Sequence, residues 1–279
     1  MEYLGYYKKV IMNILIFGAN GMLGTYISKY LTKTHINDTI INVSRNELDI
    51  SIVDENTLKS FILNNKPSWI INCAGVIKPR IQHTGEISTI KINSVFPRML
   101  ANICELNNIK CIHISTDGVF DGQLGMYTEN NIPFVSDFYG QTKLLGEPLN
   151  CATMRVCPIG EELHNKRSLI EWIKSRKNLD ANGFTNHLWN GLTSLEIAKI
   201  ISKMIDQNIY WLGIRHIHSP DTISKATLLD YINEIYNLNI SINYIEDTNK
   251  VNRSLSSIHI FPIEILPLKD QIRELKNYL

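Results

Sequence analysis

The chain has 279 residues, which suffices for one large α/β domain or for a domain with a small lobe. Apolar residues make up 44 % of it and the formal net charge is +1, so the composition gives no sign of a nucleic-acid or membrane-surface partner. No apolar run approaches the ~20 residues that span a bilayer. Residues 1–12 lack the apolar core and cleavage site of a signal peptide, and are interpreted as an N-terminal extension.

The first half of the chain alternates short apolar runs with helical segments. Helices are expected at residues 22–32, 54–64 and 87–107, and strands at 13–17, 39–43, 47–50, 68–72, 110–115 and 151–156. Strands that are apolar throughout and separated by helices are typical of a parallel sheet that is covered on both faces. The sequence therefore predicts an α/β protein with a Rossmann-like, doubly wound parallel sheet.

The pattern changes after residue 156, where the connections lengthen and the elements become mixed. Thr193 and Glu196 form a capping-box pattern for a helix over 194–205, and residues 224–236 and 269–279 predict further helices. We expect an NADP-binding domain at 13–156 and a smaller C-terminal substrate-binding lobe at 157–279, some segments of which can return to the sheet. The ligand cleft is expected between the two parts.

The five cysteines and eight histidines show no metal-ligand spacing. The cysteine count is odd, no C-x-x-C pair occurs, and most cysteines lie in apolar runs. Buried, reduced thiols in a cytoplasmic protein are the expected state, and no metal site is predicted.

A glycine-rich run follows the first predicted strand directly and opens the first predicted helix. Glycine permits a sharp turn and brings backbone N–H groups close to a pyrophosphate, toward which the helix directs its positive end. The position within a β–α–β unit supports this interpretation over an ordinary turn. The predicted cofactor-binding residues of the loop are Gly18, Asn20, Gly21, Met22, Leu23 and Gly24.

The end of the second strand decides between NAD and NADP. Where an acidic residue would bind the ribose of NAD, this chain has Ser44 and Arg45, which can donate to a 2′-phosphate. NADP(H) is therefore the predicted cofactor, although Arg45 as a solvated loop residue stays an alternative. Asp49 and Ile50 are expected beside the adenine, where a carboxylate can accept from the amino group.

Tyr139 and Lys143 are four residues apart on a predicted helix and so share one face. Tyrosine has a pKa of about 10 in its reference state, and a nearby ammonium favours the phenolate. We expect this pair to protonate a carbonyl oxygen as hydride reaches its carbon. Ser115 and Thr116 end the fifth long strand and offer hydroxyls at the sheet edge where ligands of such folds bind.

These motifs together resemble a known family. They are the glycine loop, Asn72-Cys-Ala-Gly75, Ser115-Thr-Asp-Gly-Val-Phe-Asp-Gly122, Tyr127-x-Glu129 and Tyr139-Gly-x-x-Lys143-x-x-Gly-Glu147. The chain is similar to the extended short-chain dehydrogenases/reductases, and within them to the dTDP-4-dehydrorhamnose reductase branch. The similarity runs through residues 13–156 and is weaker toward the C-terminus.

The resemblance implies a reductase that acts at C4 of a nucleotide-linked 4-keto-6-deoxyhexose. Thr116, Tyr139 and Lys143 would be catalytic. Thr116 would form a hydrogen bond with the substrate ketone or with Tyr139, and Lys143 would bind the nicotinamide ribose. Further cofactor contacts would come from Cys73, Ala74, Gly75 and Asn93, and substrate contacts from Lys78, Thr116, Asp117, Gly118, Arg155, Asn182 and Trp189. Arg155 would meet the substrate diphosphate. A homodimer stays open.

Two departures from the family pattern concern the substrate. Gly118 stands where reductases of this branch carry an aromatic residue and related epimerase/reductases carry a cysteine, so it leaves space for a substituent such as an acetamido group. The stretch Asn182–Gly191 is similar to a subgroup that makes UDP-linked 2-acetamido-2,6-dideoxy sugars, or it is a turn with Trp189 in the core of the lobe. C3 epimerisation would need a base, for which Cys73, Lys78, His83 and His164 are candidates.

Two other functions remain as alternatives. The regulatory β subunit of methionine adenosyltransferase resembles this branch, so a non-catalytic NADP-binding partner protein is the second hypothesis; the intact Thr116, Tyr139 and Lys143 favour chemistry. A dehydratase or 4-epimerase ranks lower, because Asp117 is not followed by the glutamate expected of a dehydratase.

Overall fold

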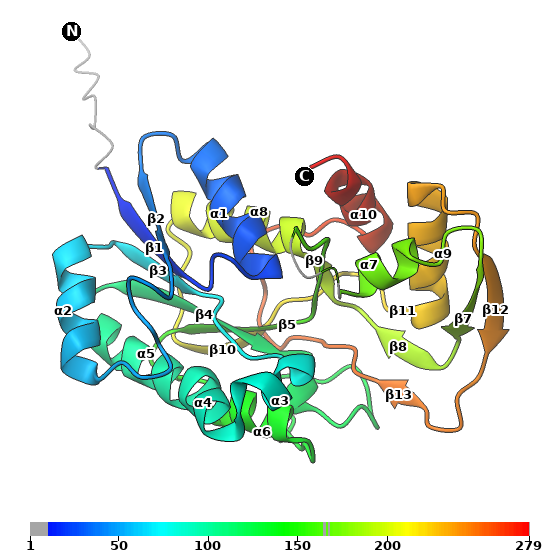
Figure 1. The fold of residues 1–279 in the computed structure, drawn as a ribbon, viewed down its shortest axis with the longest axis horizontal. Coiled ribbons are helices and arrows are strands. Elements are labelled where there is room, and N and C mark those ends of the chain that lie inside the picture. The colour runs from blue at the N-terminus through cyan, green and yellow to red at the C-terminus, as the bar shows by residue number, and fades with distance from the viewer. Residues whose placement is uncertain (1–10, 164–165, 167, 279) are drawn as a thin grey trace, which may run out of the picture.

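The computed structural model describes residues 11–163, 166 and 168–278. Its centre is a six-stranded parallel sheet with the strand order β10-β5-β4-β3-β1-β2 (Figure 1). The strands are β1 (Asn13–Phe17), β2 (Thr39–Val43), β3 (Trp69–Asn72), β4 (Lys110–Thr116), β5 (Ala152–Val156) and β10 (Gly213–His216). The predicted Rossmann-like α/β fold is confirmed.

Helices cover both faces of this sheet, as the apolar strands require. Alternate residues of β1 enter different cores: Ile14 and Ile16 pack with α1 and α8, and Leu15 and Phe17 pack with α2 and α5. The helical elements around the sheet are α1 (Met22–Thr34), α2 (Glu55–Asn65), η1 (Lys78–Arg80), α3 (Ile81–Thr84), α4 (Glu86–Ile90), η2 (Lys91–Val95), α5 (Phe96–Leu106), η3 (Asp117–Val119), α6 (Phe138–Leu145) and α8 (Ser194–Asp206).

The lobe lies beyond the carboxyl ends of the strands and consists of short strands and helices (Figure 1). Its strand β8 lies between β11 and β13, and β7 pairs with β12. The elements are β6 (Pro158–Ile159), α7 (Leu169–Lys174), β7 (Asp180–Phe184), β8 (His187–Trp189), β9 (Leu192–Thr193), β11 (Ile223–Ser224), α9 (Lys225–Tyr236), β12 (Ser241–Ile245), β13 (Val251–Asn252) and α10 (Leu268–Lys276).

Local capping chemistry explains several predicted boundaries. Asp54 accepts from the Thr57 amide at the start of α2, at 2.9 Å, and the Thr193 hydroxyl accepts from the Glu196 amide at the start of α8, at 3.1 Å. Such caps satisfy N–H groups that have no partner within the helix. The predicted helices at 54–64 and 194–205 are therefore confirmed to within one residue.

Two details of the sequence prediction were wrong or incomplete. Residues 47–50 form turns and no strand, because Ser44 and Glu47 close a turn in which the Ser44 amide donates to the Glu47 carboxylate at 2.8 Å. The expected single helix over 87–107 contains the π-helical turn η2, in which Asn93 lies. Such turns insert one residue and often mark functional sites.

The segment after residue 156 does not all belong to the lobe. Strand β10 pairs with β5 at the edge of the sheet, and α8 packs against α1 on one face of it. The chain thus leaves the sheet at 156, contributes α8 to its helical layer and returns to the sheet at 213–216. Within the described residues no helix is long and apolar enough to cross a membrane.

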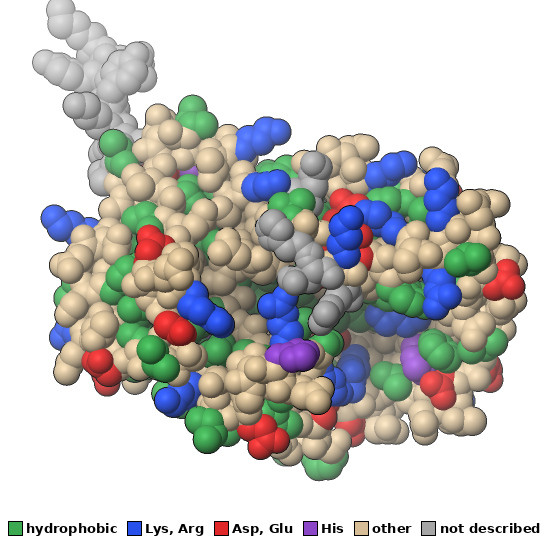
Figure 2. Space-filling view, viewed as in Figure 1, with side chains coloured by type: hydrophobic (Ala, Val, Ile, Leu, Met, Phe, Trp, Pro, Cys, Tyr) green, Lys and Arg blue, Asp and Glu red, His purple; other side chains and the backbone are tan. Residues whose placement is uncertain are grey.

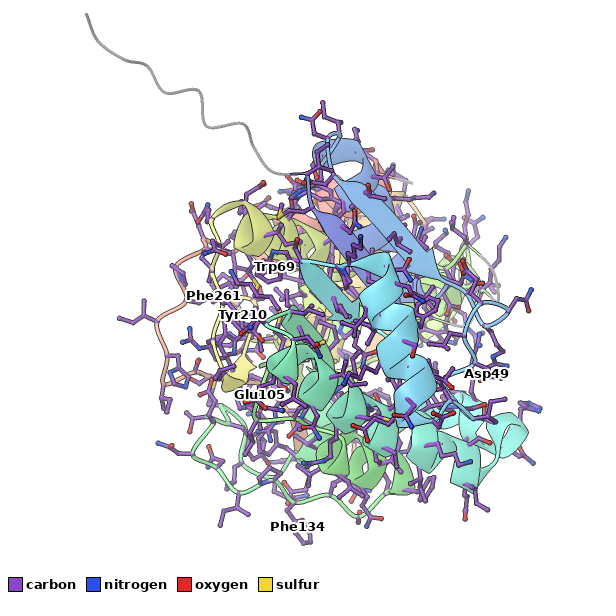
Figure 3. All side chains as sticks on the ribbon, turned by 90° about the vertical axis from the view of Figure 1, so that its left-hand side faces the viewer. Asp49, Trp69, Glu105, Phe134, Tyr210 and Phe261 are labelled. Carbon is purple, nitrogen blue, oxygen red and sulfur yellow. The ribbon has the colours of Figure 1, made fainter. Side chains whose placement is uncertain are left out.

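Aromatic side chains pack together near the amino end of β3. Trp69 at the start of β3 meets Tyr210 edge to face, with ring centroids 5.8 Å apart, and Figure 3 shows the pair near Phe261. Asp49 lies well apart from them in the same view. In open α/β sheets ligands bind at the opposite, carboxyl edge of the sheet.

Candidate active site

The register of the sheet brings the ends of its strands together. Thr116 at the end of β4 pairs with Val156 at the end of β5, and Asn72 at the end of β3 pairs with His113 of β4. The residues that follow these strands therefore gather at one edge, beside the glycine loop that follows β1. Figure 2 shows Lys, Arg and His side chains along the hollow between the sheet domain and the lobe.

The glycine loop has the shape that a pyrophosphate requires. Gly18 has φ +78°, and a Cβ there would lie 2.6 Å from the Ala74 amide nitrogen. A Cβ on Gly24 would lie 2.1 Å from the Gly18 carbonyl oxygen. Both positions thus demand glycine. Gly21 is the N-cap of α1 and has no side chain to cap the first N–H groups of the helix, which is the arrangement that binds a phosphate in such loops. The remaining predicted residues Asn20, Met22 and Leu23 lie in the same turn.

A second loop, residues 73–76 after β3, faces the glycine loop. Asn93 holds it: the side-chain oxygen accepts from the Val76 amide at 2.7 Å, and the side-chain nitrogen donates to the Val76 carbonyl at 3.0 Å and to Thr142 at 3.1 Å. These bonds occupy the Asn93 amide, which is fully buried. Asn93 is therefore a positioning residue for this loop and for α6, in place of the predicted cofactor contact.

Tyr139 lies at the start of α6 and faces Thr116. Asp137 caps the helix by accepting from the Gly140 amide at 3.0 Å, which fixes the first turn. A Cβ at Gly118 would lie 3.5 Å from the Tyr139 ring and 3.2 Å from the Thr116 hydroxyl, so all three line one space. Burial raises the pKa of Tyr139 to about 12, and the Thr116 hydroxyl acts in the opposite direction. The phenol stays protonated and can act as an acid.

Lys143 is placed differently from the sequence expectation. Its ammonium donates to the Ile114 carbonyl at 2.8 Å and lies beside Gly75, with a side chain that is 5 % exposed. Burial lowers its pKa to about 8. Burial of the phenol dominates at Tyr139, whose pKa is raised, so the lowering expected from this ammonium does not appear as a net shift.

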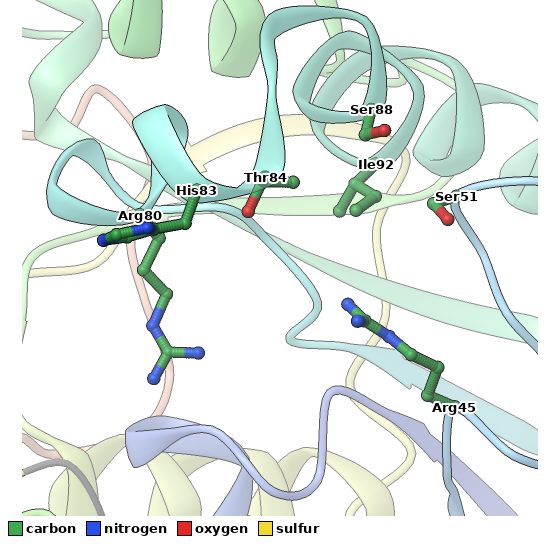
Figure 4. Close-up of a pocket in the computed structure, with 7 residues that line it drawn as sticks. All are labelled: Arg45, Ser51, Arg80, His83, Thr84, Ser88 and Ile92. Carbon is green, nitrogen blue, oxygen red and sulfur yellow. The ribbon is translucent and has the colours of Figure 1, made fainter.

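A pocket of about 490 Å³ follows the glycine loop toward the end of β2 (Figure 4). Arg45 lines one side of it, and Arg80 and His83 line the other. Ser44 is not free to donate as predicted, because its hydroxyl donates to Glu47 at 2.6 Å. The sequence analysis did not single out Glu47.

Asp49 and Ile50 lie in the turn that borders this pocket. The Asp49 carboxylate accepts from the Ser51 amide at 2.9 Å and from its hydroxyl at 2.7 Å, which lowers the pKa of Asp49. The Oδ1 atom of Asp49 is therefore occupied within the turn, and the predicted hydrogen bond with the adenine amino group would be accepted by Oδ2.

Arg155, which was predicted to contact the substrate diphosphate, is held in the core by an ion pair. Arg155 lies within β5, not after it, and is 3 % exposed. Its guanidinium binds Glu147 through two hydrogen bonds of 2.7 and 2.8 Å, and contacts His216 at 3.2 Å. In this structure the guanidinium is therefore engaged with Glu147 and His216, and its contact with a diphosphate stays a prediction.

Some of the other predicted substrate residues lie beside Thr116 and Tyr139, and others lie away from them. Asp117, Gly118 and Trp189 lie at the site, whereas Asn182 lies exposed on β7, where it bonds with Asn243 at 3.5 Å. Lys78 pairs with Asp137 at 3.3 Å near the site entrance. Of the proposed epimerase bases, Cys73 lies behind the site near Lys143, His83 faces the pocket at Arg45, and His164 is outside the described residues.

Three residues that the sequence analysis missed also lie here: Cys157, Lys225 and Arg253. Cys157 follows β5 as Asp117 follows β4, so strand register alone indicates their proximity. The Lys225 ammonium lies 4.5 Å from the centre of the Trp189 ring. Only the fold reveals Lys225 and Arg253, because both come from the lobe.

The comparisons with known proteins agree with this geometry. The model of the family described as RmlD substrate binding domain matches residues 12–157, more than half of the chain. The chain belongs to the RmlD substrate binding domain family. The resemblance that the motifs indicated, to the dTDP-4-dehydrorhamnose reductase branch, is thereby confirmed.

Curated relatives match different extents of the chain. The dTDP-4-keto-6-deoxy-D-glucose reductase of Streptomyces niveus is 32 % identical over 134 residues, 48 % of this chain and 45 % of that protein. A methionine adenosyltransferase 2 subunit beta of Danio rerio is 29 % identical over 244 residues, 81 % of this chain and 74 % of that one. The aligned part spans less than half of the first curated relatives.

The solved structures agree at the level of the fold. The dTDP-4-dehydrorhamnose reductase of Bacillus anthracis, crystallised in complex with NADP, superposes with a TM-score of 0.78 at 18 % identity. The match covers 95 % of this chain and 98 % of that one. At this identity the likeness establishes the architecture of the RmlD-type chain and no more.

Proposed function

We propose that the protein reduces the C4 ketone of a nucleotide-linked 4-keto-6-deoxyhexose with NADPH. The observation that carries the proposal is the meeting of Tyr139 and Thr116 at the sheet edge that also bears the glycine loop and Lys143. The cradle at Gly18 and Gly24, which any Cβ would fill, fits a dinucleotide pyrophosphate. The first curated relatives include reductases of such sugars.

The chain's own residues supply binding, orientation and a proton. NADPH, when bound, supplies the hydride. The hydroxyls of Thr116 and Tyr139 hold the ketone oxygen, and Tyr139 gives it a proton as negative charge develops there. Lys143, beside Gly75 and the Ile114 carbonyl, holds the nicotinamide ribose. Asn93 keeps the loop at 73–76 and helix α6 in register for this.

The sugar itself is a finer proposal. Gly118 leaves open the space above Thr116 and Tyr139, which suits a bulky sugar such as a UDP-linked 2-acetamido-2,6-dideoxyhexose, with a dTDP-linked sugar as the alternative. We also propose C3 epimerisation, a cytoplasmic location and a homodimer. Light scattering tests the dimer.

The direct test follows NADPH absorbance with dTDP-, UDP- and GDP-linked 4-keto-6-deoxy sugars. We expect oxidation of NADPH and a product that is reduced at C4, identified by mass and NMR. Purified protein that oxidises no NADPH with any of these sugars would contradict the proposed function.

Replacing Arg45 tests the preference for NADPH. A charge-assisted hydrogen bond contributes about 1.5–3 kcal/mol, so Arg45→Ala should lower kcat/KM for NADPH roughly 10- to 150-fold. The kcat/KM of the variant for NADH should stay within about twofold of the wild-type value, because NADH carries no 2′-phosphate. An equal loss with both cofactors would show that Arg45 does not bind this phosphate.

The pH profile of kcat/KM should fall on the alkaline side. Lys143 has a pKa lowered to about 8 by burial, so its ammonium is present below pH 8 and lost above it. Tyr139, with a pKa of about 12, keeps its proton throughout. We therefore expect kcat/KM, which reports on the free enzyme, to fall up to about tenfold per pH unit above 8. A flat profile from pH 8 to 10 would contradict this role of Lys143.

Unfolding would not mimic this loss. The ordinary pKa of lysine is 10.5, so between pH 8 and 10.5 the unfolded chain binds more protons at this residue than the folded chain. Stability then rises with pH in this window as far as Lys143 is concerned. Thermal unfolding at each pH separates the two effects.

The second candidate is a regulatory subunit that binds NADP without turnover. The match to a methionine adenosyltransferase 2 subunit beta over 81 % of this chain favours it. Binding of NADPH by fluorescence, together with no turnover of any sugar in the panel and a change in the kinetics of an added methionine adenosyltransferase, would support it. NADPH-dependent reduction of any one sugar in the panel would support the reductase and contradict the regulatory subunit.

A further inference from the structure

A second polar cluster lies beside Tyr139 and is not used in the proposed reduction. We call it the Lys225 cluster: Asp117, Cys157, Trp189 and Lys225. Asp117 and Cys157 follow the paired strands β4 and β5, with Thr116 and Val156 in register just before them. Ile223 of β11 pairs with Trp189 of β8, which places Lys225 next to the indole. Two strand pairings thus assemble the cluster.

Asp117 joins the Lys225 cluster to the ketone site. Its carboxyl accepts from the Thr116 hydroxyl at 3.2 Å and also meets the Cys157 thiol. Trp189 is 3 % exposed, and its indole N–H is buried without a hydrogen-bond partner among the described residues. That N–H lies toward the half-buried thiol of Cys157. The Lys225 cluster therefore lies directly against the ketone site, joined to it through Asp117 and Thr116.

Lys225 is poorly explained by the stability of the fold. It is the first residue of α9, where the helix dipole opposes a positive charge. It makes no ion pair or hydrogen bond with any described residue, and its ammonium lies over the Trp189 ring at 4.5 Å. The residue is half-buried, and Asp117 of the cluster is among the charged groups that act on its ammonium. A cation in such a place indicates a role toward the ligand.

Among the three titratable groups, Lys225 is the best base. Burial lowers the pKa of Lys225, which increases the fraction of free amine near neutral pH. Burial raises the pKa of the Cys157 thiol, and the Asp117 carboxyl beside it acts in the same direction, so a thiolate is disfavoured. The Asp117 carboxyl is 6 % exposed and already occupied by its neighbours.

We propose that the Lys225 amine removes and returns the proton of a carbon that is bonded to the C4 ketone, as a catalytic residue separate from Tyr139. This inference rests on the proposed function, because it needs the ketone to lie at Thr116 and Tyr139. Protons next to a ketone are acidic, so one well-placed base suffices.

The step balances within the site. The C–H bond breaks, its proton passes to the lone pair of the Lys225 nitrogen, and its electron pair forms the C=C bond of an enolate. The negative charge moves to the C4 oxygen, where the hydroxyls of Thr116 and Tyr139 donate to it. Return of a proton from the ammonium restores the ketone, and no oxidant or reductant is used. In deuterated water the ammonium exchanges with solvent and returns deuterium.

The experiment uses the full chain in deuterated water, without NADPH, and follows a UDP-linked 4-keto-6-deoxyhexose by proton NMR. The wild type should incorporate deuterium next to the ketone. Lys225→Met should lower the exchange rate about 10²- to 10⁴-fold, the usual contribution of such a group. Lys269→Met is the matched control: Lys269 also lies over a ring, that of Tyr231 at 5.3 Å, but pairs with Glu234 on the surface. It should exchange at the wild-type rate.

Lys225→Arg separates a base from a binding cation. A guanidinium keeps the charge but stays protonated, so exchange should be lost as in the Met variant. Exchange near the wild-type rate in Lys225→Arg would overturn the proposal. Thermal unfolding of both variants confirms that they are folded.

The outcomes also separate this inference from the proposed function. A wild type that reduces the sugar with NADPH but incorporates no deuterium overturns the role of Lys225 and leaves the reductase intact. A wild type that reduces none of the sugars overturns the proposed function, which is measured independently. The inference is supported if the exchange rate of Lys225→Met falls at least tenfold more than its rate of sugar reduction with NADPH.

Discussion

Tyr139→Phe is expected to lower kcat about 10²- to 10⁴-fold, which is the usual contribution of a positioned general acid. The change removes one oxygen atom and keeps the ring against Gly118 and Thr116. Without the phenol, the Thr116 hydroxyl is the remaining donor at the ketone oxygen, and it already donates to Asp117 at 3.2 Å. KM should change little, because the lost hydrogen bond strengthens mainly in the transition state.

Tyr244→Phe provides the matched control for this variant. It removes the same atom from a tyrosine that is 60 % exposed on the lobe, where the hydroxyl donates to Asp230 at 2.7 Å. Its kcat should equal that of the wild type. Full turnover by Tyr139→Phe, with the fold intact by circular dichroism, would remove Tyr139 from the mechanism and with it the proposed reductase chemistry.

The part of the site that the sequence predicted is the part built by neighbours in the chain. The glycine loop occupies the strand-to-helix turn after β1. Its need for glycine is local at Gly24, which approaches the Gly18 carbonyl, and at Gly18 through the positive φ of the turn, whereas the close approach of Ala74 to Gly18 is a contact between distant segments. Tyr139 and Lys143 are on one helix, and Thr116 ends a strand. Strand periodicity and helix caps carry this information in the sequence itself.

The part that was missed depends on contacts between distant segments. Lys143 turns its ammonium to the Ile114 carbonyl, 29 residues away. Lys225 reaches the site only because β11 pairs with β8. The ion pair of Arg155 has the same origin, because an arginine near the end of a strand looks exposed until its buried partner Glu147 is known. One sequence does not contain these pairings in a form that spacing alone can show.

Glu147→Gln is expected to lower the free energy of unfolding by about 3–5 kcal/mol, because it leaves a buried cation without its counter-ion. Glu147 and Arg155 are each 3 % exposed, and the carboxylate also accepts from Ser115 at 2.6 Å. The pair ties the end of α6, which carries Tyr139 and Lys143, to β4 and β5. Denaturant unfolding at pH 7 measures the loss.

Two further variants show whether the loss comes from the unpaired charge. Glu234→Gln removes a carboxylate from a surface pair with Lys269, which contributes only about 0–1 kcal/mol. The double variant Glu147→Met with Arg155→Met removes both buried charges, and should recover much of the stability lost in Glu147→Gln because no charge stays uncompensated in the core. If Glu147→Gln instead unfolds at the same denaturant concentration as Glu234→Gln, water must reach Arg155. Its guanidinium would then be available to a ligand after all, as the sequence first indicated.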